Sequence, residues 1–394
     1  MEYKDTLMKK MRPQVPFCKK IGQIGITMGD PSGIGPEVTL KALAILGHPQ
    51  EVRPSRQVGI SAPDTFCVGT GSPQQDTVII GSRNIIEETK NRYNIKWDGE
   101  VIDCVDVKRE DIGYGKVSEL AGRAAYQSIL TGYKLVSSKI ISALVTAPIN
   151  KASVNLVCPF PPGSPPEPPP KRDKRDFASS TFSGHTELLA SLSGTKRFAM
   201  LLMGDTLRVT LVTTHIPLKE VARKLNVASI VSKIELTADF LTQNLGIISP
   251  LIGVCALNPH GGEGIFGIEE SEIILPAIEE AKSKGINVKG PYPADTLFVP
   301  QKTEVRKQKS ENRSQKFDAI IAMYHDQGMI PIKIREFGNA VNITLGLPFM
   351  RTSPDHGTAF NIAGKGVANP ISMIKAIRVA QRLGSLKVQK SKSS

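Results

Sequence analysis

Short apolar segments alternate with amphipathic segments along most of the chain. The apolar segments are β-prone and end near glycine, proline or polar residues; the clearest are 21–28, 140–146, 208–214, 251–257 and 319–324. Between them, apolar positions recur at helical spacing, as in 36–46, 227–245 and 269–284, and residues 371–383 have the pattern of a closing amphipathic helix. Buried strands that alternate with helices predict an α/β fold with a largely parallel sheet. The 394-residue length and the wide spread of motifs favour two such lobes around a cleft.

Four segments depart from this alternation. Residues 155–182 are crowded with prolines followed by a basic run, and residues 302–316 are polar, charged and aperiodic. Both are therefore predicted to be surface insertions. Residues 1–20 are expected to be an N-terminal extension and not a secretory signal, because they are charged and no apolar stretch follows them. With residues 384–394 as a basic tail, the two-lobed domain is expected over residues 21–383, with lobes discontinuous in sequence.

Composition limits the classes of function. The net charge is +13, but the rest of the chain is close to neutral once four tail or insertion segments are set aside: 1–20, 171–176, 302–316 and 382–394. Such charge runs are usually solvated, so we expect no nucleic-acid partner. No apolar run is long enough to span a bilayer, so we expect no membrane anchor. The five cysteines form no C-x-x-C pair, which fits a reducing cytoplasm better than a disulfide framework.

The histidines are the first candidates for chemistry. Of six in the chain, His215, His260 and His325 directly follow a strand-like run or lie just past its end. Ligands of open α/β folds bind beyond the carboxyl ends of strands. Three imidazoles that leave open coordination positions are typical of a catalytic divalent metal site. Taken singly, each is more readily an ordinary loop or core histidine; the joint placement of three at strand ends leaves both interpretations open.

Two further groups of residues suit an anionic ligand. The string from Gly29 to Pro36 is predicted to be a loop between a strand and a helix, yet it is neither G-x-G-x-x-G nor a P-loop. It is a tight turn or, if it binds anything, an anion site built from backbone N–H groups. Lys333, Asn342 and Arg351 follow His325 closely, and together they could bind a phosphorylated acid.

Long strings in the chain resemble one family. They are ITMGDPSGIGPEV, VTAPINK, GHTELLA, TTHIPL, LNPHGGEG, GPYPADTLF, DAIIAMYHDQGMIPIK and VNITLGLPFMRTSPDHGTAFNIAGKG. In this order, from Ile26 to about Gly366, they are similar to the 4-hydroxythreonine-4-phosphate dehydrogenase family of pyridoxal phosphate (vitamin B6) biosynthesis. The resemblance covers most of the chain outside the tails and insertions.

The resemblance implies a fold and a set of site residues. The fold would be the two-lobed isocitrate/isopropylmalate dehydrogenase-like fold with an active-site cleft, in a homodimer whose active site lies at the subunit interface. One divalent metal per subunit (Zn, Mg or Co) would be bound by His215, His260 and His325. NAD or NADP would be the second cofactor. The substrate would be bound by five residues: His185, Thr186, Lys333, Asn342 and Arg351.

The implied reaction is the oxidation of 4-phosphooxy-L-threonine to 2-amino-3-oxo-4-phosphobutanoate, which decarboxylates to 3-amino-2-oxopropyl phosphate. The metal would act as a Lewis acid on the 3-hydroxyl, and a nearby group would take its proton. Lys333 is the first candidate for this catalytic proton transfer and Asp295 the second.

The chain departs from the family pattern in places. The insertion 155–182 replaces a short turn ahead of His185, and Asn361 stands where aspartate is common. The nearest alternative is a D-threonate or D-erythronate 4-phosphate dehydrogenase of sugar-acid catabolism. A phosphotransferase that uses the loop at residues 29–35, and an inactive binding protein, are more distant alternatives.

Overall fold

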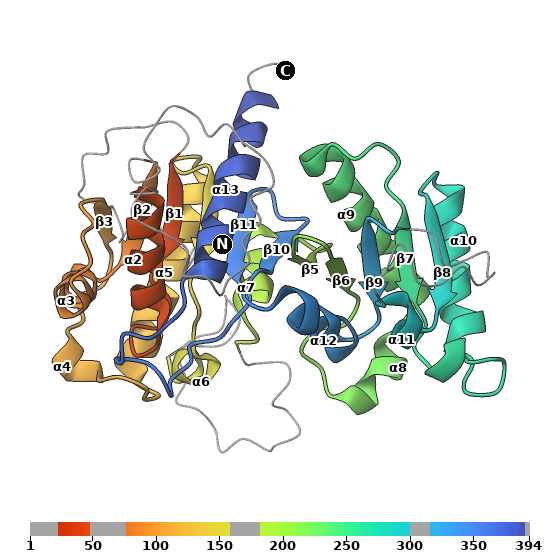
Figure 1. Cartoon of the computed structure of the whole chain (residues 1–394), viewed down its shortest axis with the longest axis horizontal. Helices are drawn as coiled ribbons and strands as arrows, with labels where there is room; N and C mark the ends of the chain where they lie inside the picture. Colours follow the sequence, from red (N-terminus) through yellow and green to blue (C-terminus); the bar gives the residue numbers. More distant parts are fainter. Residues whose placement is uncertain (1–22, 48–75, 158–181, 300–315, 391–394) are drawn as a thin grey trace, which may run out of the picture. The chain divides into compact units, whose positions relative to one another are not determined.

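A computed structural model of the chain describes residues 23–47, 76–157, 182–299 and 316–390. The chain divides into two compact units, Met1–Leu188 with Gly357–Ala368 and Leu189–His356 with Asn369–Ser394 (Figure 1). Each unit is therefore built from more than one stretch of sequence. The expected extension at 1–20, and most of the expected insertions 155–182 and 302–316, lie outside the described residues.

The first unit contains a parallel sheet with the strand order β3-β2-β1-β4. Every residue of β1, β2 and β4 is buried, as expected for apolar parallel strands that are covered on both faces. The strand at the end of this order, β3, is buried only at its two central residues. The strand bounds are β1 (Ile24–Thr27), β2 (Thr77–Gly81), β3 (Glu100–Asp103) and β4 (Ala143–Thr146).

Polar residues fix where the helices of this unit begin. Ser82 accepts a hydrogen bond from Ile85 N at the start of α3, Ser118 accepts one from Ala121 N at the start of α5, and Asn150 caps α6. These side-chain caps satisfy N–H groups that lack a partner within the helix. The helices are α2 (Gly35–Gly47), α3 (Arg83–Tyr93), α4 (Arg109–Ile112), α5 (Glu119–Ser137) and α6 (Lys151–Asn155), while α7 (His185–Ser193) contains the boundary between the units.

The second unit has the strand order β11-β10-β5-β6-β9-β7-β8. Its first four strands pair antiparallel, and β6, β9, β7 and β8 pair parallel. The strand bounds are β5 (Ala199–Met203), β6 (Arg208–Leu211), β7 (Ile252–Cys255), β8 (Val288–Tyr292), β9 (Ala319–Ala322), β10 (Val341–Leu345) and β11 (Met350–Pro354). The helices are η1 (Leu218–Glu220), α8 (Val221–Lys224), α9 (Val227–Leu245), η2 (Pro259–Gly261), η3 (Glu270–Ile274), α10 (Leu275–Ser283), α11 (Ala294–Leu297), α12 (His325–Glu336) and α13 (Ile371–Lys390).

Alternate residues of the central strand β9 serve two cores. Ile321 packs into a cluster with Ile234 of α9 and Ile278 of α10. Ile320 packs into a second cluster that includes Ile332 of α12. Because successive strand residues point to opposite faces, helices on both sides of the sheet are needed to bury this apolar run.

The expected α/β class is confirmed. The five predicted strands become β1, β4, β6, β7 and β9, and the helix expected at 227–245 is α9. The expected segment 269–284 is helical but begins with a π turn, η3. The closing helix α13 does not end at Leu383: it continues to Lys390, into the expected basic tail.

Helix α12 was not predicted, because Gly328 and Pro331 interrupt its pattern. Pro331 lacks the N–H that an interior helical residue normally donates. The antiparallel strands β5, β10 and β11 were also missed, so the sheet of the second unit is less parallel than expected.

No helix in the described part of the chain is both long enough and apolar enough to cross a bilayer.

Candidate active site

The three histidines predicted to bind metal follow three neighbouring strands. His215 follows β6, His325 begins α12 directly after β9, and His260 lies in the turn after β7. These strands are adjacent and parallel in the order β6-β9-β7. All three imidazoles therefore belong to segments that leave the same edge of the sheet.

Hydrogen bonds hold these three segments together. Thr213 Oγ1, after β6, donates to Met323 O after β9 over 2.8 Å. Gln327 of α12 accepts from Met323 N and donates from Nε2 to Ala256 O after β7, both over 2.7 Å. The spacing of the segments that carry the histidines is thus fixed by protein contacts.

Two of the three imidazoles lie side by side. The ring centroids of His215 and His325 are 5.9 Å apart, with the ring planes at 42°. His325 Nδ1 lies 2.7 Å from Oδ1 of Asp326. A carboxylate that accepts from Nδ1–H leaves the lone pair on Nε2, which is the arrangement a metal-ligating histidine needs.

His260 is not gathered with this pair. Its side chain is exposed, and its backbone is left-handed, with φ 54° and ψ 16°. Across the described ranges, no three or more His, Cys, Asp or Glu side chains are arranged so that they could hold a metal ion. The three-histidine metal site therefore stays a prediction.

Asn342 and Arg351 lie on the two strands of the β10-β11 pair. The antiparallel register pairs Asn342 with Ser353 and Ile343 with Thr352, so Arg351 lies opposite Thr344 on the same face as Asn342. Arg351 is buried and donates to Thr344 Oγ1 over 3.0 Å. The Oδ1 atom of Asn342 is buried and has no hydrogen-bond partner among the residues that the structure describes. A buried acceptor of this kind commonly finds its partner on a ligand or an ordered water.

Lys333 lies on α12, two turns after His325. Its ammonium donates to the backbone oxygen and to Oδ2 of Asp355, over 2.6 and 2.8 Å. The Asp355 side chain is 2% exposed, whereas that of Lys333 is 35% exposed. The cation is thus fixed from the protein side while part of it stays accessible.

The remaining predicted residues lie elsewhere. Asp295, the second proton-transfer candidate, is exposed in the first turn of α11. His185 and Thr186 begin α7 and belong to the first unit, while all the other predicted site residues belong to the second. Thr186 is buried.

The loop after β1 proves to be a closed turn. The N–H groups of Ser32, Gly33 and Ile34 donate to Asp30 Oδ1, Asp30 O and Thr358 O over 2.8 to 3.0 Å. An anion at this helix start would have to displace those acceptors. The structure therefore favours the tight-turn interpretation of the loop over the anion site.

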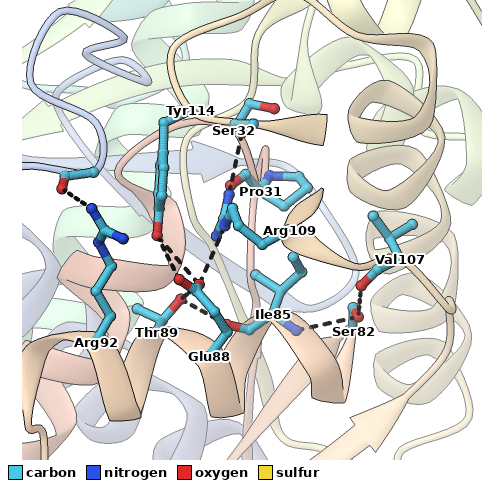
Figure 2. A network of polar contacts seen from close by, with 12 residues as sticks. Pro31, Ser32, Ser82, Ile85, Glu88, Thr89, Arg92, Val107, Arg109 and Tyr114 are labelled. Atoms are coloured by element: carbon cyan, nitrogen blue, oxygen red, sulfur yellow. Dashed lines mark hydrogen bonds and ion pairs between the residues drawn. The ribbon is translucent and has the colours of Figure 1, made fainter. Parts of the chain in front are cut away.

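A partly buried polar network fixes this turn, as Figure 2 shows. Arg109 donates to the backbone oxygen of Pro31 and to Glu88 Oε2, and Tyr114 OH donates to Glu88 as well. Burial raises the pKa of the Asp30 carboxyl, against the lowering effect of its hydrogen bond from Ser32 N. The network ties the turn to α3 and α4.

Sequence reasoning missed the acidic residues that support the candidate site. Asp326 and Asp355 contact His325 and Lys333, and Glu270 binds the turn that carries His260. Asp326 adjoins its histidine in the sequence, which is a usable signal. Asp355 and Glu270 act across turns and helices, and no local pattern marks them.

Fold and site together define an α/β protein in which three candidate histidines follow adjacent parallel strands. The model of the family described as pyridoxal phosphate biosynthetic protein PdxA matches residues 68–161 and 169–380. The chain belongs to this family.

Relatives with assigned names support this membership. The chain is 41% identical to a 4-hydroxythreonine-4-phosphate dehydrogenase of Desulforapulum autotrophicum over 91% of this chain and 94% of the relative. It is 39% identical to a D-threonate 4-phosphate dehydrogenase of Cupriavidus necator over 92% and 97%. A crystal structure of 4-hydroxythreonine-4-phosphate dehydrogenase from Klebsiella pneumoniae has a TM-score of 0.66 and 32% identity, over 92% of this chain and 99% of the other.

Proposed function

We propose that this protein oxidises 4-phosphooxy-L-threonine to 2-amino-3-oxo-4-phosphobutanoate, which then loses carbon dioxide to give 3-amino-2-oxopropyl phosphate. One observation carries the proposal. The chain is 41% identical to a 4-hydroxythreonine-4-phosphate dehydrogenase, and its three candidate histidines follow three adjacent parallel strands. When bound, NAD or NADP supplies the hydride acceptor. In the oxidation, the C3 hydride leaves with its electron pair and the hydroxyl proton passes to a base.

His215, His260 and His325 are the proposed ligands of one divalent cation, Zn, Mg or Co. The close rings of His215 and His325 and the carboxylate on His325 Nδ1 fit such a cation. When bound, the cation supplies Lewis-acid stabilisation for the alkoxide oxygen. The strand-end hydrogen bonds then serve to keep the ligating segments in register.

Lys333 is the better of the two proton-transfer candidates. In the step that takes the hydroxyl proton, Lys333 would have to be a neutral amine, whose two hydrogens suffice for the two contacts with Asp355. Its lone pair would then accept the proton of the substrate hydroxyl, whereas Asp295 lies exposed on a short helix. After it has taken the proton, Lys333 carries a positive charge that suits the phosphorylated acid.

The other proposed substrate contacts share a chemistry suited to phosphate and carboxylate. Arg351 offers a planar fork of donors, and Asn342 adds an amide whose buried oxygen has no partner within the described part of the chain. His185 and Thr186, at the start of α7, complete the proposed set.

A coupled assay tests the reaction. Reduced nicotinamide should appear with 4-phosphooxy-L-threonine, disappear after treatment with a chelator, and return with zinc, cobalt or magnesium. A His215→Ala protein should lose both metal and rate. Unchanged metal content and rate in that variant would refute the ligand assignment.

The second candidate function is oxidation of D-threonate 4-phosphate. It is favoured by relatives of that name at 38–39% identity over nearly the same span. The two substrates share the phosphate and the secondary alcohol, so the same residues suit both. The ratio of kcat/KM for the two substrates in steady-state assays decides between them.

A homodimer is part of the proposal. Ile330, Ile334 and Phe337 form an apolar stripe along α12 and its end, and they are 58%, 77% and 81% exposed. The same helix begins with His325 and carries Lys333, so a second copy seated on the stripe would lie beside the candidate site. Ile334→Asp should shift sedimentation toward the monomer. Ile248→Asp, at a residue 92% exposed, should not.

A cytoplasmic location also belongs to the proposal. Cys104 and Cys255 are free thiols, as expected in a reducing compartment.

A further inference from the structure

The turn that carries His260 has an unusual backbone. His260, Gly261 and Gly262 all have positive φ, at 54°, 76° and 81°. A non-glycine residue in this region pays a steric cost, and it persists only where surrounding contacts determine its conformation.

Glu270 supplies contacts just before His260. Its Oε1 accepts hydrogen bonds from Leu257 N and Asn258 N, over 2.9 and 2.7 Å. Its Oε2 accepts from Nδ2 of Asn258 over 2.9 Å. The side chain is buried, and burial alone would raise its pKa, but the hydrogen bonds from Asn258 and Leu257 lower the pKa overall.

Glu270 also lies against the residue that follows the turn. A Cβ on Gly262 would lie 2.7 Å from Glu270 Oε2, closer than such atoms approach in proteins. One carboxylate thus touches the chain on both sides of His260. Neighbouring Glu269 assists, because its Oε2 accepts from Asn258 Nδ2 over 2.9 Å.

The local structure around Glu270 is itself special. Glu270 is the first residue of η3, a single π turn that leads into α10. Isolated π turns inside helices are rare and occur frequently at functional sites. Glu270 is therefore a buried carboxylate, set on an uncommon turn, that binds the backbone before a strained histidine.

We propose that Glu270 is a positioning residue: it fixes the backbone of the His260 turn at the end of β7, from where the His260 side chain, by rotation, would complete the ligand set of the proposed cation. This inference rests on the proposed function, because the cation is part of that proposal. Glu270 itself does not contact the cation. It acts through the backbone of residues 257–262.

Zinc affinity, measured by competition with a chelating dye, tests the inference. Glu270→Ala removes every contact of the carboxylate, so it should weaken zinc binding roughly tenfold to a hundredfold. Glu270→Gln should recover most of the loss, because the amide oxygen can still accept from both backbone N–H groups. Glu272→Ala, at an exposed glutamate of the same π turn, is the matched control and should bind as the unsubstituted protein does.

A readout without metal separates a local effect from global damage. In the metal-free protein, amide hydrogen exchange of residues 257–262 should quicken in Glu270→Ala while exchange in β9 stays unchanged. If Glu270→Ala does not fold, Asn258→Ala decides. That variant removes only the side-chain contacts with Glu269 and Glu270, and it should still weaken zinc binding several-fold.

The outcomes separate the two proposals. Failure of the unsubstituted protein to bind zinc would refute the proposed metal site, and this inference with it. Zinc binding by the unsubstituted protein, with affinity in a folded Glu270→Ala protein within about twofold of it, would overturn the inference alone.

Discussion

Lys333 Nζ lies 2.8 Å from Oδ2 of Asp355, and the contact joins a partly exposed lysine side chain to a buried carboxylate. The other oxygen of Asp355 accepts from Ser372 Oγ of α13 over 2.9 Å, and Ser372 Oγ in turn accepts from Asp355 N. The carboxylate is thus fixed before it meets the lysine. A fixed carboxylate can hold the ammonium in one position, whereas a solvated lysine side chain has no single position.

This relationship gives the first prediction. Asp355→Asn removes the charge that holds Lys333, so kcat/KM should fall roughly tenfold to a hundredfold. KM should rise, because the Lys333 ammonium is no longer held in position to bind the substrate. Steady-state kinetics measure both parameters. Asp239→Asn, at an exposed aspartate of α9, is the control and should leave both unchanged. Equal kinetics in Asp355→Asn and the control would show that the pair has no part in substrate binding.

The pair also illustrates what the sequence could reveal about the site. Lys333 was predicted from its place after an apolar run. Its partner Asp355 directly follows β11, an antiparallel strand that the sequence pattern did not predict. Antiparallel β10 and β11 are short and half-apolar, and their pairing is what puts Asn342 and Arg351 on one face. The strands without polar side chains, such as β7 and β9, were predictable because burial on both faces leaves a continuous apolar run.

For the histidines too, the sequence predicts local features but not the contacts between distant segments. That each follows a strand could be predicted locally, because a strand-like run precedes it. That their strands are neighbours is a property of the strand order β6-β9-β7. It pairs Val209 with Ile320 and Ile252 with Ala319, which are 111 and 67 residues apart, so no local signal marks it. The left-handed turn at His260 depends on Glu270, a contact formed only once η3 packs back on the end of β7.

Arg351 gives the second prediction, through the geometry of its donors. Arg351→Lys keeps the charge but replaces a planar fork with a single ammonium, and the hydrogen bond from the guanidinium to Thr344 Oγ1 is lost as well. KM for the phosphorylated substrate should rise about tenfold or more, with a smaller change in kcat. Steady-state assays with Arg378→Lys, at an exposed arginine of α13, provide the comparison. An unchanged KM would remove Arg351 from the proposed substrate site.

A third prediction concerns stability of the first unit. Lys41 Nζ donates to Glu37 Oε1 and to the backbone oxygens of Gly366 and Ala368, and Ala368 N donates back to Glu37. These contacts hold the returning segment Gly357–Ala368 on α2. Lys41→Met leaves the two carbonyls without this donor, and the buried Glu37 carboxylate loses its ammonium partner and keeps the hydrogen bond from Ala368 N. The free energy of unfolding should therefore fall by ~1–3 kcal/mol.

The control for that prediction is an ion pair at the surface. Arg123 and Glu119 are both about 60% exposed, at 62% and 61%, and are four residues apart on α5. Arg123→Met should cost less than ~0.5 kcal/mol, because exposed pairs gain little in water. Urea denaturation measures both variants, and an equal, small effect for Lys41→Met would mean that the returning segment is held by other contacts.

The last prediction uses Lys233 of α9, whose ammonium donates to the backbone oxygen of Phe198. Burial, with a smaller effect of nearby Arg197, lowers the pKa of Lys233 from 10.5 to about 8. Between these two values the unfolded chain binds a proton that the folded chain does not, so the contribution of Lys233 to stability should rise with pH across this window.

Lys233→Met removes the cost of burying the charge. It should therefore raise the free energy of unfolding by ~1–2 kcal/mol at pH 7, and this advantage should shrink as the pH approaches 10.5. Thermal unfolding from pH 7 to 10.5 measures the trend, with Lys219→Met at an exposed position as the reference. An advantage that stays constant over this range would contradict the assigned shift, because a lysine with an ordinary pKa ionises alike in both states.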